Sequence, residues 1–184
     1  MKPVFVTSNE SKLREAAQIL GVDLDRADLE VPEIQSLDFG EVAAAKARAA
    51  REALGAPSYP VIVDDSGLAI RVWNGFPGPL TRWLMQSVGN AGLLKMLATE
   101  EDRSALAVCV VAVAESSGSV QVFRGVVRGE VSREPRGESG FGFDPIFIRE
   151  GETRTYAEMG EEKSADSHRA RALRAARHGL EKIW

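Results

Sequence analysis

The sequence predicts an α/β domain built around a central mixed β-sheet. Short apolar runs alternate with segments of helical periodicity along all 184 residues, a pattern typical of a sheet flanked by helices. Two long apolar segments, residues 104–115 and 120–132, are separated only by Ser116-Ser117-Gly118-Ser119, which predicts a β-hairpin. The length corresponds to a single domain, residues 1–184.

The N-terminal part begins with a strand and two helices. Val4-Phe5-Val6 is a short apolar strand, and apolar residues at i, i+3, i+4 and i+7 after it predict a helix that closes at Gly21. Asp38, with Glu41 three positions later, is typical of the start of a second helix. This alanine-rich helix is expected to end at Gly55, just before two prolines.

The rest of the chain continues the alternation. Residues 60–63 are a continuous apolar run, expected to be a strand that is buried on both faces and that ends at two carboxylates. The further elements are a strand and a Gly/Pro-rich turn in 67–79, short helices in 81–89 and 90–98, a strand in 140–148 and a C-terminal helix in 163–184.

Composition and charge exclude several classes of protein. A net charge of -4 argues against wholesale wrapping of nucleic acid. No apolar run approaches the roughly 20 residues of a membrane helix, and Met1-Lys2-Pro3 leads directly into a strand rather than a signal peptide. The single cysteine, Cys109, lies in an apolar run and is typical of a reducing compartment. We therefore expect a cytoplasmic protein that binds no nucleic acid polymer and no membrane.

The first candidate site is the turn between the first strand and helix. It is polar at every position from Thr7, Ser8 and Asn9 to Lys12. Backbone N–H groups and the positive end of the helix dipole form an anion site, to which Lys12 would add a point charge. The glycines of a Walker loop are absent. An ordinary capped surface helix is the alternative, because the spacing of Thr7 and Glu10 is common.

The second candidate is Asp64-Asp65-Ser66-Gly67. Open α/β sheets bind their ligands at the carboxyl ends of strands, where these two carboxylates are expected. Because side chains alternate along a strand, one aspartate should point into the cleft while other groups hold its neighbour. Carboxylate oxygens together with substrate phosphates are the ligands that Mg²⁺ prefers. The alternative is a simple turn.

The third candidate is the stretch from Ser139 to Pro145. Glycines beside Phe141 and Phe143 allow a flat ring to approach the backbone, so that a base could stack on either phenylalanine. Asp144 beside this platform can accept a hydrogen bond from a ring N–H. A bulged strand with two core phenylalanines is the alternative.

The fourth candidate surrounds the start of the C-terminal helix. Lys163 precedes this helix, and His168 and Arg169 lie on its first turns, where they can donate to carbonyl or phosphate oxygens. A lone histidine here would more commonly be a surface residue.

Together these motifs resemble the inosine triphosphatase/HAM1 family of non-canonical purine nucleoside triphosphate pyrophosphatases, over nearly the whole chain. The stretches that carry the resemblance are Thr7-Ser8-Asn9 through Lys12, the loop of Glu33, Asp64-Asp65-Ser66-Gly67-Leu68, Gly75-Phe76-Pro77-Gly78-Pro79, Phe141-Gly142-Phe143-Asp144-Pro145, Glu162-Lys163-Ser164 and Ser167-His168-Arg169.

The resemblance implies a two-lobed fold around an elongated central mixed sheet, a nucleotide cleft between the lobes and a homodimer. It also implies roles for residues at matching positions. Glu33 and Asp65 would hold Mg²⁺, and Asp65 corresponds to the proton acceptor. The triphosphate would be bound by Thr7, Ser8, Asn9, Lys12, Lys46 and Arg82, with Ser66 touching the substrate, and the base pocket would be formed by Phe141, Gly142, Phe143, Asp144, Lys163, His168 and Arg169.

Two positions depart from the pattern of this family. Ser8 replaces the glycine usual between the threonine and the asparagine, which could crowd the phosphate loop. Val42 replaces an asparagine that often follows the glutamate of the second helix. Neither change removes a charge, so we expect altered rates rather than lost activity.

The implied reaction is hydrolysis of ITP, dITP or XTP to the monophosphate and pyrophosphate, by attack of water on the α-phosphorus. Asp65 would take the proton, while Lys12 and Lys46 would stabilise charge on the phosphates. Two other functions stay open: a pyrophosphatase for another modified nucleotide, and a non-catalytic nucleotide-binding protein.

Overall fold

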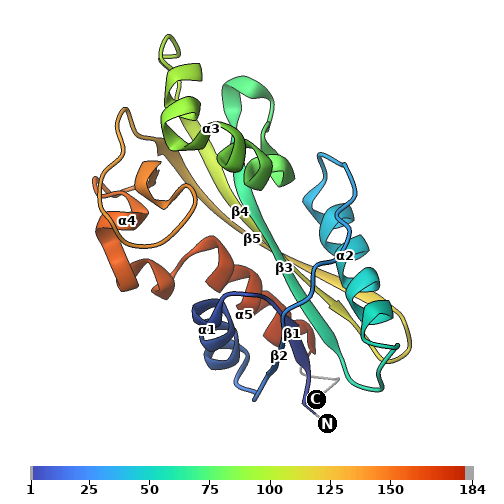
Figure 1. The fold of residues 1–184 in the computed structure, drawn as a ribbon. Coiled ribbons are helices and arrows are strands. Elements are labelled where there is room, and N and C mark those ends of the chain that lie inside the picture. The colour runs from blue at the N-terminus through green and yellow to red at the C-terminus, as the bar shows by residue number, and fades with distance from the viewer. Residues whose placement is uncertain (1, 181–184) are drawn as a thin grey trace.

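The computed structural model describes residues 2–180 and shows a six-stranded mixed sheet flanked by helices (Figure 1). The strand order is β2-β1-β3-β4-β5-β6; β1 pairs in parallel with β2 and β3, and the other pairs are antiparallel. The strands are β1 (Val4–Val6), β2 (Asp25–Ala27), β3 (Val61–Ile70), β4 (Ser104–Ala114), β5 (Val120–Val131) and β6 (Phe147–Arg149). The α-helices are α1 (Glu10–Leu20), α2 (Phe39–Ala53), α3 (Thr81–Met96), α4 (Tyr156–Met159) and α5 (His168–Leu180). The 3-10 helices are η1 (Arg71–Trp73), η2 (Gly78–Leu80), η3 (Asp144–Ile146) and η4 (Gly160–Ala165).

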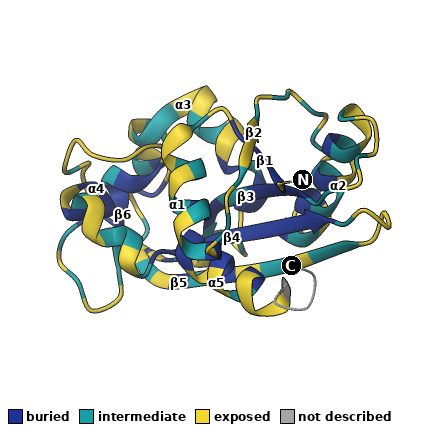
Figure 2. Ribbon diagram, turned by 90° about the horizontal axis from the view of Figure 1, so that it is seen from below, coloured by how far each residue is buried: buried dark blue, intermediate teal, exposed yellow. Residues whose placement is uncertain are grey.

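The helices cover both faces of the sheet. Alternate residues of β3 and β4 pack on opposite sides: Val61 and Val63 belong to the core beneath α2, whereas Ile62 belongs to the core shared with α1 and α5. Figure 1 shows α1 and α5 side by side, with α2 on the other side of the strands. Strands β1, β3 and β4 are mostly buried between these layers, whereas β5 is partly exposed (Figure 2).

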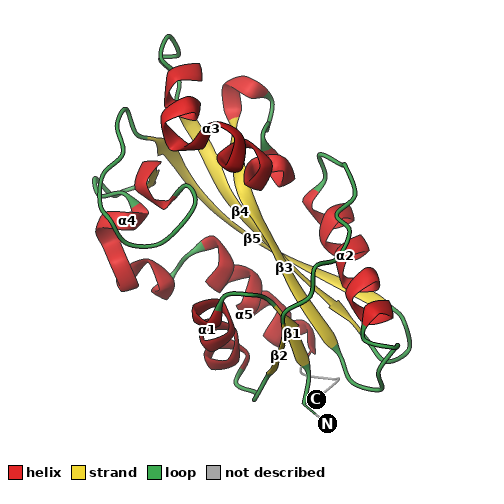
Figure 3. Cartoon of the chain, viewed as in Figure 1, coloured by secondary structure: helices red, strands yellow, loops and turns green. Residues whose placement is uncertain are grey.

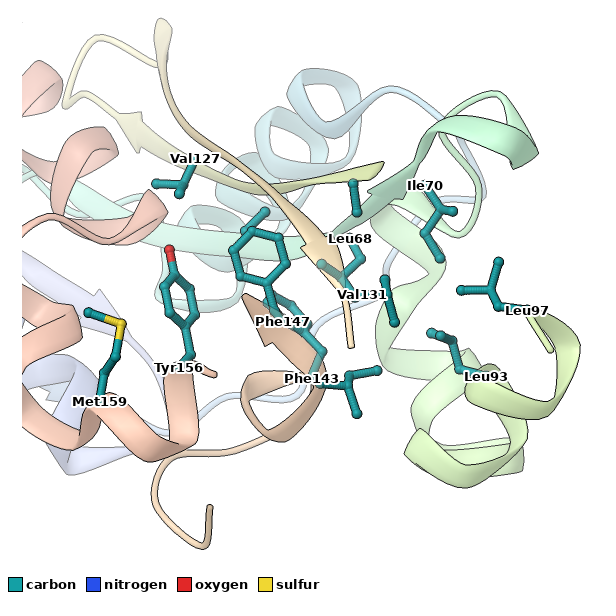
Figure 4. Packing of buried hydrophobic residues seen from close by; sticks show 13 residues of the cluster. Leu68, Ile70, Leu93, Leu97, Val127, Val131, Phe143, Phe147, Tyr156 and Met159 are labelled. Atoms are coloured by element: carbon teal, nitrogen blue, oxygen red, sulfur yellow. The ribbon is translucent and has the colours of Figure 1, made fainter. Parts of the chain in front are cut away.

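A third core lies at the far end of the sheet, beneath α3 and α4. It is built from residues such as Leu68, Leu93 and Val131, together with the rings of Phe147 and Tyr156, as Figure 4 shows. This core anchors the segments that carry the predicted base pocket.

The local signals in the N-terminal half are confirmed. Gly21 ends α1 in the left-handed region at φ 73°. The cap of α1 differs from the Thr7/Glu10 spacing, because Asn9 accepts from the N–H groups of Ser11 and Lys12. Asp38 caps α2 by accepting from the Glu41 N–H. Helix α2 stops at Ala53, close to the predicted end.

The hairpin and the paired short helices are also confirmed (Figure 3). Strands β4 and β5 pair from Ser104↔Glu130 to Ala114↔Val120. Residues 81–96 contain a break at Gly89, which has non-helical angles of φ 64° and ψ -172° and divides α3 into two helical pieces.

Three predictions about elements are wrong in part. The strand predicted for 60–63 does not end at the carboxylates but continues through them to Ile70, because every residue from Val61 to Ile70 pairs with β4. In 140–148 the strand is limited to β6, and a 3-10 turn precedes it.

The C-terminal helix begins at His168 rather than 163, since η4 occupies the preceding residues. Its predicted residues 181–184 lie outside the described part of the chain. Strand β2 was not predicted. No helix among residues 2–180 is both long and apolar enough to cross a membrane.

Candidate active site

A cavity of about 640 Å³ lies at a notch in the edge of the sheet. Strand β1 pairs with β3 only at Val4↔Val61 and Phe5↔Ile62, so the later part of β3 has no strand on that side. The cavity is lined there by the end of β1, the middle of β3, the loop after β2, helix α2, the first part of α3, residues 141–144 and the start of α5.

Asp64 points toward the α1 and α5 side of the sheet. Its carboxylate accepts hydrogen bonds from Lys12 Nζ at 3.2 and 3.3 Å and from Arg169 Nε at 2.9 Å. Burial alone would raise the pKa of Asp64, but Lys12 and Arg169 outweigh it and hold this pKa well below the ordinary value. Asp64 is therefore the neighbour that other groups hold, as the alternation predicted, but it also lines the cavity together with Asp65.

Asp65 points to the opposite side, toward α2. Burial raises the pKa of Asp65 to about 7, supported by the negative charges of Glu33 and Asp64 and opposed by Lys46. Its Oδ2 atom is buried and has no hydrogen-bond partner in the described part of the chain. A carboxylate with such a pKa and a free buried oxygen is suited to accept a proton or to ligate a cation.

The cations expected to bind phosphates are all paired with carboxylates around the cavity. Lys46 Nζ lies 2.6 Å from Glu33 Oε1, and Arg82 Nη1 lies 3.6 Å from the same atom. Lys12 is paired with Asp64, as above. An anionic ligand entering the cavity would therefore compete with these carboxylates for the cations.

Residues 140–144 form a tight turn at the predicted base pocket. The Asp144 carboxylate accepts from the Phe141 N–H at 2.8 Å and from Lys163 Nζ. A Cβ on Gly140 would lie 2.1 Å from Asp144 Oδ2, so this turn requires glycine.

The two phenylalanines have different environments. Phe141 is 48% exposed, and the charged groups of Lys12, Lys163 and Arg169 lie 5.2 to 5.6 Å from its ring centroid. Phe143 is 7% exposed, belongs to the far core and still lines the cavity. Phe141 is thus the more exposed of the two rings.

His168 is buried rather than on the surface. It is 6% exposed and lines the cavity. Burial, together with the positive charges of Arg169 and Lys163, lowers the pKa of His168 to about 3, so the imidazole is neutral at physiological pH. Arg169 beside it is anchored by Asp64 and by Glu15 Oε2 at 3.4 Å.

Nearly all predicted site residues meet at this one cavity. The exception is Asn9, whose side chain caps α1 and does not line it. The lining residues among those predicted are Thr7, Ser8, Lys12, Glu33, Lys46, Asp65, Ser66, Arg82, Phe141, Gly142, Phe143, Asp144, Lys163, His168 and Arg169.

Several lining residues were missed. Glu15 lies one helical turn after Lys12, and this i, i+3 spacing could have indicated it. Asp28 and Glu30 follow β2, whose end lies beside that of β1. Met85 and Gln86 on α3 also line the cavity, without any local signal.

Gly67 explains how α3 reaches the site. A Cβ on this glycine would lie 2.2 Å from the Gly78 carbonyl oxygen and 2.6 Å from Thr81 Oγ1. The absence of a side chain lets η2 and the first turn of α3 rest directly on β3, where Thr81 Oγ1 accepts from the Leu68 N–H at 2.9 Å. This contact places Arg82 beside Glu33.

The arrangement can be compared with known proteins. A model of the Ham1 family matches residues 3–178. The chain belongs to the Ham1 family. Among Ham1 relatives, the dITP/XTP pyrophosphatase of Methanopyrus kandleri is 50% identical over 177 residues, covering 94% of this chain and 93% of the relative. The inosine triphosphate pyrophosphatase of Tuber melanosporum is 42% identical over 182 residues, covering 96% and 95%.

Solved structures agree with this Ham1 assignment. The Ham1 protein of Staphylococcus aureus superposes with a TM-score of 0.83 at 31% identity, and all of both chains is covered. The nucleoside-triphosphatase, or dITP/XTP pyrophosphatase, of Mycobacterium abscessus has a TM-score of 0.74 at 37% identity, covering 96% of this chain and 98% of that one.

Proposed function

We propose that this protein hydrolyses non-canonical purine nucleoside triphosphates, namely ITP, dITP and XTP, to the monophosphate and pyrophosphate. Relatives that match over more than nine tenths of the chain carry the names dITP/XTP pyrophosphatase and inosine triphosphate pyrophosphatase. The observation in the structure that supports the proposal best is Asp65, a buried carboxylate with a free oxygen beside a cluster of cations.

Glu33 and Asp65 fit a divalent cation, and we assign Mg²⁺ to them. Asp65 Oδ2 is buried without a partner among the described residues, and the negative charge of Glu33 in the same cavity raises the pKa of Asp65. No group of three or more His, Cys, Asp or Glu ligands occurs within residues 2–180, which accords with a site completed by substrate phosphates. When bound, Mg²⁺ would neutralise phosphate charge and orient or activate the attacking water.

The protein's own residues have distinct roles in this reaction. Asp65 accepts the proton of the water that attacks the α-phosphorus, because its carboxylate lines the cavity and has a buried oxygen without a hydrogen-bond partner among the described residues. Lys12 and Lys46 stabilise negative charge on the transferring and leaving phosphates. The bond between the α-phosphorus and the oxygen that bridges the α- and β-phosphates breaks, and pyrophosphate leaves with this oxygen.

Selectivity is expected at the 6-position of the purine. Inosine and xanthosine carry an oxygen there, which can accept a hydrogen bond from His168 or Arg169. Adenosine carries an amino group there, whose N–H donors would face the N–H donor of the protein. A buried donor left unpaired costs about 1 to 3 kcal/mol, which corresponds to about 5- to 150-fold discrimination. Phe141 offers the exposed ring on which the base can stack.

The test is Mg²⁺-dependent release of pyrophosphate from ITP and XTP, compared with ATP, GTP, dUTP and CTP, with Asp65→Asn as the inactive control. We expect ITP and XTP to be hydrolysed at least about tenfold faster than the others, roughly 1.4 kcal/mol of discrimination. Because GTP shares the 6-oxo group, its exclusion has to arise at the 2-position of the purine. A preference for another base would indicate a different modified nucleotide. Binding of ITP without any pyrophosphate release would favour a nucleotide-binding protein.

We also propose that the protein is a cytoplasmic homodimer, as its family resemblance implies. Light scattering coupled to size-exclusion chromatography would give the molar mass in solution. Twice the chain mass of 19.9 kDa is the expected value, and a monomer at micromolar concentration would contradict it.

A further inference from the structure

We propose that Tyr156 is a positioning residue for base recognition. Its ring orients the imidazole of His168, and this orientation favours binding of a 6-oxo purine. The inference rests on the proposed function, in which His168 faces the base. Tyr156 is 1% exposed and does not line the cavity. It can therefore affect selectivity only through the residues that it touches.

His168 lacks the usual means of fixing a histidine ring. In binding sites the ring is ordinarily oriented by a hydrogen bond at the nitrogen that faces away from the ligand. His168 Nδ1 is buried and has no hydrogen-bond partner among the described residues. Packing of the ring must therefore set its orientation.

Two aromatic rings provide this packing. Tyr156 lies parallel to His168, with centroids 5.9 Å apart and an interplanar angle of 8°. The ring centroid of Phe143 lies 5.7 Å from that of the imidazole, with an interplanar angle of 39°. A parallel neighbour resists tilting of the imidazole plane, so Tyr156 is the stronger constraint on its direction.

Tyr156 is itself held firmly. Its ring packs edge-on against the ring of Phe147, with centroids 4.9 Å apart. Figure 4 shows the two rings next to each other in this core. It is the first residue of α4, whose start is closed by a reciprocal capping box between Thr155 and Glu158. The Tyr156 hydroxyl is buried without a partner in the described chain, which indicates that the ring rather than the hydroxyl performs the positioning.

The orientation of His168 matters because its imidazole is neutral. A neutral imidazole has one N–H donor and one acceptor nitrogen. A donor aimed at the 6-position favours an oxo group, whereas a tilted ring loses this hydrogen bond and with it the discrimination against an amino group. Selectivity, more than the phosphate chemistry, should respond to loss of the Tyr156 ring.

The test compares kcat/KM for ITP and for ATP in the wild type, Tyr156→Leu and Tyr156→Phe. We expect Tyr156→Leu to lower the ITP-to-ATP ratio about tenfold, the scale of one lost hydrogen bond, and Tyr156→Phe to keep the ratio of the wild type. If the leucine variant does not fold, Tyr156→Met serves the same comparison, because methionine has no planar ring and its flexible side chain fills irregular gaps in a core.

Leu97→Ala is the control for a change in this core. Leu97 is 0% exposed and belongs to the same cluster, but Figure 4 shows it on the opposite side of this core from Tyr156. It should lower stability while leaving the ITP-to-ATP ratio unchanged. If Leu97→Ala and Tyr156→Leu lower the ratio equally, Tyr156 is only a core residue and the proposal fails.

A double-mutant cycle with His168→Ala tests the route of the effect. Once the imidazole is absent, Tyr156→Leu should no longer change the ratio. A persistent change would overturn the assignment and indicate Lys163, whose Nζ lies 5.6 Å from the Tyr156 ring centroid. The same measurements distinguish failure of the proposed function from failure of this inference. If the wild type shows no preference for ITP, the proposed function fails. If His168→Ala removes the preference and Tyr156→Leu does not, only the role of Tyr156 is contradicted.

Discussion

At the residue scale, Asp64 and Asp65 are neighbours with opposite electrostatic environments. Two cations hold the carboxylate of Asp64 ionised, whereas burial raises the pKa of Asp65 to about 7. The difference arises because successive residues of a strand point to opposite faces. Lys12 and Arg169 approach one face, and Lys46, already paired with Glu33, approaches the other.

Asp65→Asn should stabilise the metal-free protein at high pH. The pKa of Asp65 in the folded state, about 7, lies above its ordinary value of 3.8. The stability contributed by its protonated form is complete below about pH 3.8 and is lost as the pH rises through 7. An asparagine does not titrate, so the variant should gain up to about 4 kcal/mol over the wild type above pH 7.

Denaturant unfolding in EDTA at pH 4 and pH 8 measures this difference. The gain should shrink at pH 4, where the wild-type carboxyl is protonated. Equal differences at both pH values would contradict a raised pKa.

Glu33→Gln should increase the affinity for nucleotide when no divalent cation is present. Glu33 accepts from Lys46 at 2.6 Å and lies 3.6 Å from Arg82. Removing its charge releases both cations for phosphate oxygens, and we expect about five- to tenfold tighter binding of an ITP analogue that resists cleavage, on the order of 1 kcal/mol. Calorimetry in EDTA measures this affinity.

Glu30→Gln is the control for the change of net charge alone. Glu30 is exposed, lines the same cavity and forms no ion pair within the described chain. A similar increase in both variants would show that bulk charge, and not the release of Lys46, governs affinity.

At the element scale, the site depends on the close contact of η2 and α3 with β3. Gly67→Ala should separate them, because its Cβ would meet the backbone oxygen of Gly78, which has no flexible end to move aside. We expect a loss of about 1 to 3 kcal/mol of stability and a raised KM for ITP, since α3 carries Arg82. Urea unfolding and steady-state kinetics measure the two effects.

Gly40→Ala provides the comparison for Gly67→Ala. Its Cβ would meet only the ends of side chains, Asp38 Oδ1 at 3.0 Å and Val122 Cγ1 at 3.8 Å, and alanine favours a helix more than glycine does. It should change stability by less than about 1 kcal/mol. Comparable losses in both variants would refute a special role for the contact at Gly67.

At the scale of the whole molecule, Asp64 joins two helices to the sheet. Its carboxylate on β3 binds Lys12 of α1 and Arg169 of α5. Asp64→Asn leaves both cations without their buried partner and should lower the free energy of unfolding by about 3 to 5 kcal/mol at pH 7.

The effect of Asp64→Asn should depend on pH in the opposite sense to Asp65→Asn. The folded-state pKa of Asp64 lies below the ordinary value of 3.8, so its contribution is present above pH 3.8 and is lost as the pH falls below it. Unfolding at pH 7 and at pH 3 should therefore show a smaller difference from the wild type at pH 3. A difference that does not vary with pH would contradict the lowered pKa.

The sequence by itself determined the features that depend on near neighbours. The cap at Asp38, the end of the first helix at Gly21, the hairpin after Ala114 and the break near Gly89 follow from capping, turn chemistry and glycine, all of which act over a few residues. The residues predicted for the site were also named from sequence, because motifs that resemble the family mark them, and all of them except Asn9 line one cavity.

The tertiary structure alone decided what depends on distant partners. Residues 60–70 contain a charged and glycine-containing segment that is typical of a turn, yet pairing with β4 along its length makes it one strand. The early end of β1 then exposes the edge of β3 on which both aspartates meet the cavity. The pKa of Asp65, the orientation of His168 and the pairing of each cation arise from burial and from contacts far apart in the chain, which local sequence patterns do not encode.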